Sequence, residues 1–155
     1  MARVESIRGG KEKRSMARFL PRTTAGCVAR EFPGFVEPCL ATLSYKAPDG
    51  DRWVHEIKFD GYRAQAHLQS HKAKILTRRG HDWTARFSSI AEAITDFPAR
   101  HMILDGEVIV PRASGGADFG ELQKDLARGQ AGGFVYYAFD LLYLDGFDLQ
   151  GASLR

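Results

Sequence analysis

The chain has 155 residues, of which 44% are hydrophobic and 26% charged, which is enough for one domain with a buried core. Neither an apolar run of membrane-spanning length nor a secretory signal is present, so no membrane partner is expected. Cys27 and Cys39 form neither a CxxC pair nor a disulfide framework, which is typical of a reduced cytosolic protein.

Residues 1–30 are predicted to form a basic flexible arm or linker. They hold eight Lys or Arg and two Asp or Glu, a net charge of +6, whereas the remaining 125 residues have a net charge of −3. The segment lacks a helical or strand period and contains a Gly9-Gly10 pair. Two interpretations stay open: salt-sensitive contact with DNA phosphates, or a linker or solubilising tail, which short basic arms more often are.

The hydrophobic pattern of residues 31–155 predicts an α+β domain. Strands are expected near 52–59, 62–69, 72–77, 102–110 and 134–144, and helices over 86–97 and 118–128. Asp-Gly pairs at 49–50, 60–61, 105–106 and 145–146 predict turns. Hairpins with helices between them favour antiparallel sheets with flanking helices over a doubly wound parallel fold.

The segment 56–63, Glu-Ile-Lys-Phe-Asp-Gly-Tyr-Arg, is the most informative. In a strand over 52–59, period-2 alternation places Glu56 and Lys58 together on the polar face. Asp60-Gly61 predicts a two-residue hairpin turn, because glycine tolerates a positive φ. From these residues alone, the lysine is either a solvated charge, which is the common case, or a nucleophile. A nucleophilic lysine must be neutral, which burial or nearby positive charge favours.

The same eight residues resemble the active-site motif of the covalent nucleotidyltransferases, whose shared core is Lys-x-Asp-Gly. They are most similar to the ATP-dependent DNA ligases, in particular the ligase module of bacterial end-joining ligases. Further segments resemble that family in the same order along the chain: a lead-in at Pro38 to Leu43, with Cys39 where the family usually has Gln, then Thr77 to Thr84, Leu104 to Glu107, and Tyr136 to Gly146. The resemblance covers residues 35–155.

This resemblance implies a nucleotidyltransferase (ATP-grasp-like) adenylation domain over residues 31–155. Lys58 would be the catalytic nucleophile, attacking the α-phosphate of ATP, expelling pyrophosphate and leaving lysyl-AMP. The implied ATP-binding residues are Glu56 beside the adenine edge, Arg63 on AMP or nick phosphates, Arg78 on phosphate near the reacting end, Glu107 on the ribose, and Phe139 stacked on adenine. Mg²⁺ or Mn²⁺ would assist, with Glu107 as an indirect metal residue.

Taken singly, these residues have structural interpretations as well. Arg78 could belong to a solvated basic face, Glu107 could occupy the outward position of a strand, and Phe139 lies in an apolar run typical of a core strand. The implied function is sealing of nicked or broken double-stranded DNA in repair and recombination, with end-joining repair proteins as partners.

No Lys-x-Lys pair follows Phe139, although the family has one after a later glutamate motif. We therefore expect an adenylation domain that is incomplete at the C-terminus, as a fragment or a truncated form. Two alternatives stay open. The first is a catalytically inactive ligase remnant that acts as a weak nucleotide-binding or interaction module. The second is an RNA ligase or capping-type enzyme, against which the string Phe-Asp-Leu-Leu-Tyr at 139–143 favours a DNA ligase.

Overall fold

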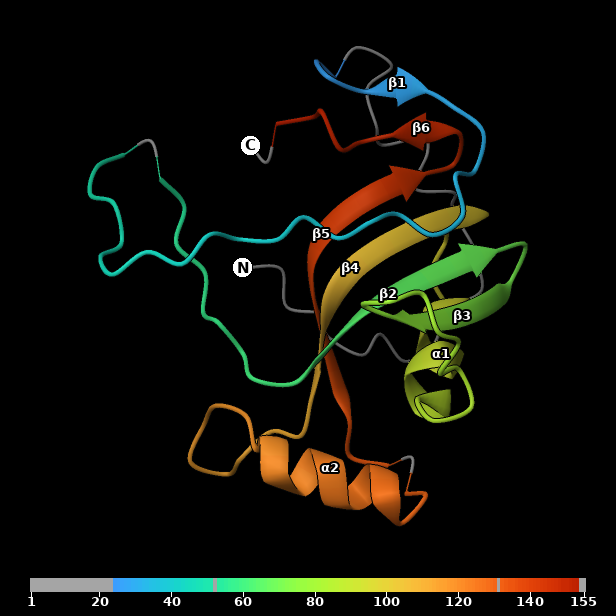
Figure 1. Cartoon of the computed structure of the whole chain (residues 1–155). Coiled ribbons are helices and arrows are strands. Elements are labelled where there is room, and N and C mark those ends of the chain that lie inside the picture. Colours follow the sequence, from blue (N-terminus) through green and yellow to red (C-terminus); the bar gives the residue numbers. More distant parts are fainter. Residues whose placement is uncertain (1–23, 52, 131, 154–155) are drawn as a thin grey trace.

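The fold is one antiparallel sheet with two short helices, seen in a computed structural model that describes residues 24–51, 53–130 and 132–153 (Figure 1). The strands are β1 (Val28–Ala29), β2 (Tyr62–Gln69), β3 (Lys72–Thr77), β4 (His101–Ile109), β5 (Val135–Leu144) and β6 (Phe147–Asp148), in the order β1-β6-β5-β4-β2-β3. The helices are α1 (Ser88–Thr95) and α2 (Phe119–Ala127). The predicted antiparallel α+β architecture is confirmed, and neither helix is long and apolar enough to cross a bilayer.

One face of the sheet carries the main core. Alternate residues of β2 and β4 point into it and are fully or almost fully buried: Ala64, Ala66 and Leu68 from β2, and Met102, Leu104 and Val108 from β4. Helix α1 adds Ile90, Ala91 and Ile94, which recur at helical spacing, and α2 adds Leu122. Burying a leucine or isoleucine side chain in this way contributes about 1.5–3 kcal/mol. Asp118 caps α2 by accepting a hydrogen bond of 2.9 Å from the backbone N–H of Glu121.

The opposite face of the sheet is polar along its centre. Here Arg63, Gln65 and His67 of β2 stand opposite Glu107, Asp105 and Ile103 of β4. The segment that follows β1 crosses this face in front of β5 and β4 (Figure 1), where Phe32 and Val36 pack on Ile103, Leu142 and Tyr143. This polar face, rather than the core face, is therefore where a binding site is to be sought.

Four of the predicted strands form within one residue of their expected bounds. Of the strand predicted over 52–59, residues 53–59 are described, and they form no strand. Residues 53–60 are extended without a strand partner in the described part of the chain, and Trp53, Val54 and Ile57 are exposed. The period-2 pattern was a misleading guide because alternation predicts which residues share a face, not whether another strand is available to pair.

Two of the four predicted Asp-Gly turns are also wrong. Gly61 leads directly into β2 without a hairpin, and its φ is not positive. Gly106 lies inside β4, where an added Cβ would fall 2.6 Å from the ring of Tyr136. At both positions, the absence of a Cβ allows a neighbouring strand to pack closely, and neither glycine forms a turn. By contrast, Asp145-Gly146 joins β5 to β6 with φ values of 42° and 102°, as a two-residue hairpin requires.

The predicted arm, residues 1–30, lies outside the described residues as far as position 23. Within its described end, Val28–Ala29 pairs with β6, and Arg30 makes an ion pair of 2.9 Å with Asp148. The sheet thus begins before residue 31, and the last residues of the predicted arm belong to the ordered body.

We predict that stability depends on the protonation of His67. Burial, with a smaller contribution from the positive charge of Lys74, lowers the pKa of His67 to about 4. Because an unfolded histidine titrates near 6.5, the unfolded state binds more protons between pH 4 and 6.5, and stability falls as pH drops through that range. The loss reaches about 3 kcal/mol at its lower end. Urea unfolding at pH 4–8 measures it.

His71, which is exposed in the β2–β3 turn, provides the matched control. His67→Asn should reduce the slope between pH 4 and 6.5, whereas His71→Asn should keep it. An unchanged slope in His67→Asn would assign the effect to other groups.

Candidate active site

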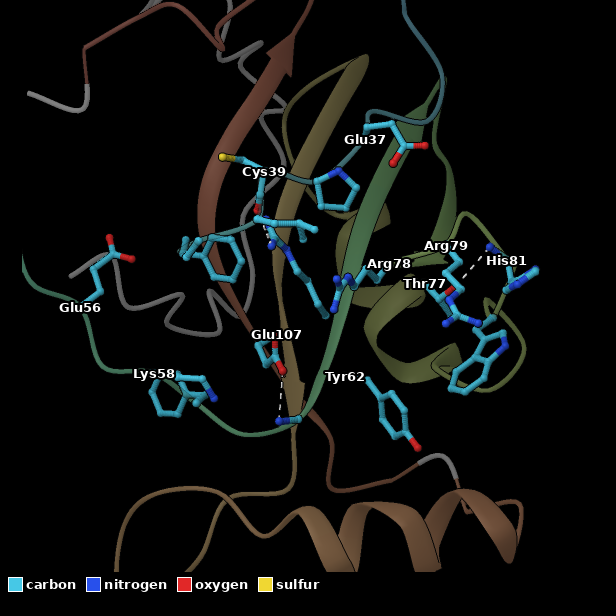
Figure 2. Close-up of a pocket in the computed structure, with 18 of the residues that line it drawn as sticks. Glu37, Cys39, Glu56, Lys58, Tyr62, Thr77, Arg78, Arg79, His81 and Glu107 are labelled. Carbon is cyan, nitrogen blue, oxygen red and sulfur yellow. Dashed lines mark hydrogen bonds between the residues drawn. The ribbon is translucent and has the colours of Figure 1, made fainter. Parts of the chain in front are cut away.

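A pocket of about 1320 Å³ opens on the polar face of the sheet (Figure 2). Its walls come from the lead-in segment 37–41, the end of the extended segment with the start of β2 (56–63), the loop after β3, and the neighbouring strands β4 and β5. All six residues predicted as site residues line it: Glu56, Lys58, Arg63, Arg78, Glu107 and Phe139. The chain therefore brings together residues from four separate motifs, and their individual chemical roles stay predictions.

Arg63 is the most heavily bonded of these residues. Its Nε and Nη2 donate to the two carboxylate oxygens of Asp105 at 3.3 and 2.8 Å. Its Nη1 donates to the backbone carbonyl of Cys39 at 2.7 Å. The hydrogen bond to Asp105 raises the pKa of Arg63, so the guanidinium stays charged. Arg63 thus fixes the lead-in segment against β2 and β4.

Lys58 lies in the extended segment just before two anchors. Immediately after it, the ring of Phe59 stacks on Tyr137 with centroids 4.1 Å apart. Gly61 then donates its backbone N–H to Glu107 Oε1 at 3.0 Å, the contact drawn in Figure 2. A side chain at position 61 would bring Cβ within 2.1 Å of the carbonyl oxygen of Val108. Glycine is therefore required here so that the lysine segment can lie close against β4.

Glu107 is half-buried on β4, opposite Arg63 in the strand register. Burial raises its pKa, while the N–H of Gly61 and the positive charges of Lys58 and Arg63 act in the opposite direction. Glu107 occupies an outward position of its strand, as its structural interpretation suggested, and this position faces the pocket.

A β-bulge presents Phe139 to the pocket. The register of β4 and β5 shifts between Asp105↔Asp140 and Gly106↔Ala138, so Phe139 is the extra, unpaired residue. Bulges re-aim side chains in this way and are frequent beside active sites. Phe139 is 40% exposed, with the Arg63 guanidinium 5.5 Å from its ring centroid. The apolar run around Phe139 is typical of a core strand and predicts a core position. That prediction is wrong, because the side chain is exposed and lines the pocket.

The loop after β3 supplies Arg78. Its backbone N–H bonds to the carbonyl of Arg63 at 3.2 Å, and Gly80, with φ of +77°, closes the turn onto Thr77. Figure 2 shows Arg78 beside the centre of the pocket and Glu56 apart from it, at the outer end of the extended segment.

Two functional neighbours were missed by sequence reasoning. Asp105, the buried partner of Arg63, was assigned to a turn because glycine follows it. Tyr137, which supports Phe59, lies in an apolar run that gives no hint of exposure. The only sequence signal for Asp105 was its place inside the Leu-Asp-Gly-Glu motif.

Comparison with known proteins identifies the class. The family model of the ATP dependent DNA ligase domain matches residues 38–155, so the chain belongs to the ATP-dependent DNA ligase domain family. The chain is 36% identical over 123 residues to the multifunctional non-homologous end joining protein LigD of Pseudomonas aeruginosa, an alignment that covers 79% of this chain and 14% of that protein.

Other relatives agree. A probable DNA ligase of Kineococcus radiotolerans is 38% identical over 101 residues, covering 64% of this chain and 20% of the relative. A solved structure of mycobacterial DNA ligase D complexed with ATP and MES superposes with a TM-score of 0.52 at 35% identity, over 59% of this chain and 29% of that one. The chain thus spans only about a seventh to a fifth of the length of these two curated relatives.

We predict that Gly61→Ala destabilises the fold and displaces the lysine segment. The new Cβ would overlap the Val108 carbonyl, and relieving such overpacking costs about 1–3 kcal/mol. Thermal unfolding measures the cost, and the backbone N–H signal of residue 61 in NMR spectra reports its bond to Glu107. Gly132→Ala is the matched control because nothing lies within 4 Å of its Cβ position. Equal stability of the two variants would contradict the close approach.

Proposed function

We propose that this chain carries the nucleotide site at which an ATP-dependent DNA ligase forms its covalent adenylate. The observation that carries the proposal is that Lys58 and the five other motif residues line one pocket, although they come from four separate motifs of the sequence. Membership of the ligase domain family supports it. The arrangement favours the nucleotidyltransferase (ATP-grasp-like) form of the antiparallel fold, with residues 31–155 as part of an adenylation domain.

In the proposed reaction, the neutral amine of Lys58 attacks the α-phosphorus of ATP. A nitrogen–phosphorus bond forms, the bond from the α-phosphorus to the bridging oxygen breaks, and pyrophosphate leaves with the electron pair. The amine loses its proton, so the product is a lysyl-AMP phosphoramidate. This covalent step divides a difficult transfer into two easier ones.

The pocket residues suit the parts of ATP that the family resemblance assigns to them. Phe139 offers an exposed ring for adenine, and Glu107 offers a half-buried carboxylate for the ribose. Arg78 is exposed and close to the pocket centre, where phosphate charge would lie. Glu56 would reach the adenine edge from the extended segment, and Arg63 would contact AMP while holding the lead-in.

A divalent cation such as Mg²⁺ or Mn²⁺ fits this pocket only as a partner of the nucleotide. Within residues 24–51, 53–130 and 132–153, no group of three or more His, Cys, Asp or Glu side chains could hold a metal. Magnesium commonly uses one or two carboxylates together with substrate phosphates and water, which matches an indirect role for Glu107. Bound there, the cation would neutralise charge that develops on the phosphates.

The wider activity follows from the family. We propose that this protein seals nicked or broken double-stranded DNA and works with end-joining repair proteins at the bacterial nucleoid. Residues 1–30, with their net charge of +6, would add salt-sensitive contact with DNA phosphates or link to a neighbouring domain.

Label transfer tests the proposed chemistry. Incubation with Mg²⁺ and ATP labelled on the α-phosphate should place label on the protein, and added pyrophosphate should remove it. Lys58→Ala should abolish the label, whereas the exposed Lys72→Ala on β3 should keep it. Label that persists in Lys58→Ala would sink the proposal, and ATP binding without label would favour an inactive nucleotide-binding module.

We further predict that Phe139→Ala weakens ATP binding. Stacking of a base on an aromatic side chain contributes roughly 1–3 kcal/mol, so the Kd should rise about tenfold or more. Val135→Ala is the matched control: Val135 is an exposed apolar residue of the same strand that does not line the pocket. Calorimetric titration with ATP measures both variants. Equal affinities would remove Phe139 from the adenine site.

A further inference from the structure

Gln65 is a buried polar residue on the pocket face of β2, between Arg63 and His67. Only 1% of it is exposed. Its side-chain amide makes both backbone hydrogen bonds of a single distant residue: Val36 N–H donates to Oε1 at 3.3 Å, and Nε2 donates to the Val36 carbonyl at 2.6 Å. Gln65 therefore pairs with Val36 as a neighbouring strand would, although no strand forms there.

His67 sets the orientation of this amide. Its Nε2 lies 3.1 Å from Gln65 Oε1, which can only accept, so Nε2 carries the proton of the neutral ring. Burial favours that neutral form by lowering the pKa of His67. With Oε1 accepting from both His67 and Val36, the Nε2 group of Gln65 is directed to the Val36 carbonyl.

The residue held in this way, Val36, directly precedes the lead-in segment 37–41. Phe32 packs edge-on against Tyr143 at 5.3 Å, and Cys39 is held by Arg63 through its carbonyl. Val36 lies between these two anchors, and the pocket wall begins at the next residue, Glu37. Residues 32–39 have no strand pairing of their own. Gln65 therefore makes the hydrogen bonds that fix Val36, in the middle of this stretch.

We propose that Gln65 is a positioning residue of the nucleotide site, which holds the wall formed by residues 37–41 ready for ATP. This inference rests on the proposed function. A wall that is already ordered avoids the entropy cost of ordering it when the ligand binds. Without the amide of Gln65, the two backbone groups of Val36 would lose their partners and the wall would loosen toward solvent.

The test uses the whole 155-residue chain, with Gln65→Leu as the main variant. Two quantities are measured well below the unfolding temperature: the hydrogen-exchange rate of the Val36 amide and the Kd for ATP. We expect faster exchange and a Kd raised about tenfold, in keeping with the loss of a buried hydrogen-bond pair. If Gln65→Leu fails to fold, Phe32→Ala is the second variant: it removes a neighbouring anchor, whose ring packs against Tyr143 and His67, while every residue of β2 stays unchanged. It should weaken ATP binding in the same direction.

Two controls separate positioning from general destabilisation. Gln69→Leu makes the same change at the exposed end of β2, and Leu122→Ala removes a fully buried core side chain of α2 away from the pocket. Both should keep the ATP affinity of the unsubstituted chain. The inference is overturned if Gln65→Leu speeds Val36 exchange without changing the Kd, or if Leu122→Ala weakens ATP binding equally. An unsubstituted chain that binds no ATP would instead overturn the proposed function, and this inference with it.

Discussion

The ion pair between Arg63 and Asp105 is the interaction on which the site depends. Only 4% of the Asp105 side chain is exposed, so its charge must be matched in place by the bidentate guanidinium. Removing one partner of such a buried pair typically costs about 3–5 kcal/mol, because the other charge is left uncompensated. The same guanidinium holds Cys39 and lies near Phe139, so one side chain links β2, β4, the lead-in and the bulge.

Two irregular features of the backbone lie at the pocket. The close approach at Gly61 and the bulge at Phe139 both lie where regular pairing would not place Lys58 and an exposed ring on one face. The regular parts of β2 and β4 bury Ala64, Ala66 and Leu104 and provide a rigid base. The regularly paired strands thus provide the core, and the irregular features at Gly61 and Phe139 position the candidate site residues beside it.

Sequence periodicity predicted the core well and the site poorly. The strands at 62–69 and 72–77 were predicted within their observed bounds, because alternation reflects a sheet with one buried face. The site residues came from ordered motifs instead. Neither route could predict the bulge at Phe139 or the absence of a strand partner for the described residues 53–59, since both depend on how distant segments pair. The turn at Ser70-His71 was not predicted either, because its positive φ values occur without a glycine.

The charge balance of the pocket follows from these contacts and bears on how ATP would bind. Asp105 already compensates Arg63, and Lys58 must be neutral when it attacks, so neither supplies its full charge to a triphosphate. Among the pocket-lining residues, the remaining cationic side chains are Arg78 and Arg79, with His81 beside them. Two arginines cannot match the several negative charges of ATP, whereas a divalent cation bound to the phosphates can reduce that deficit. The buried Arg63–Asp105 pair, which builds the pocket, thus leaves less positive charge free for a triphosphate, which agrees with the proposed role of a divalent cation.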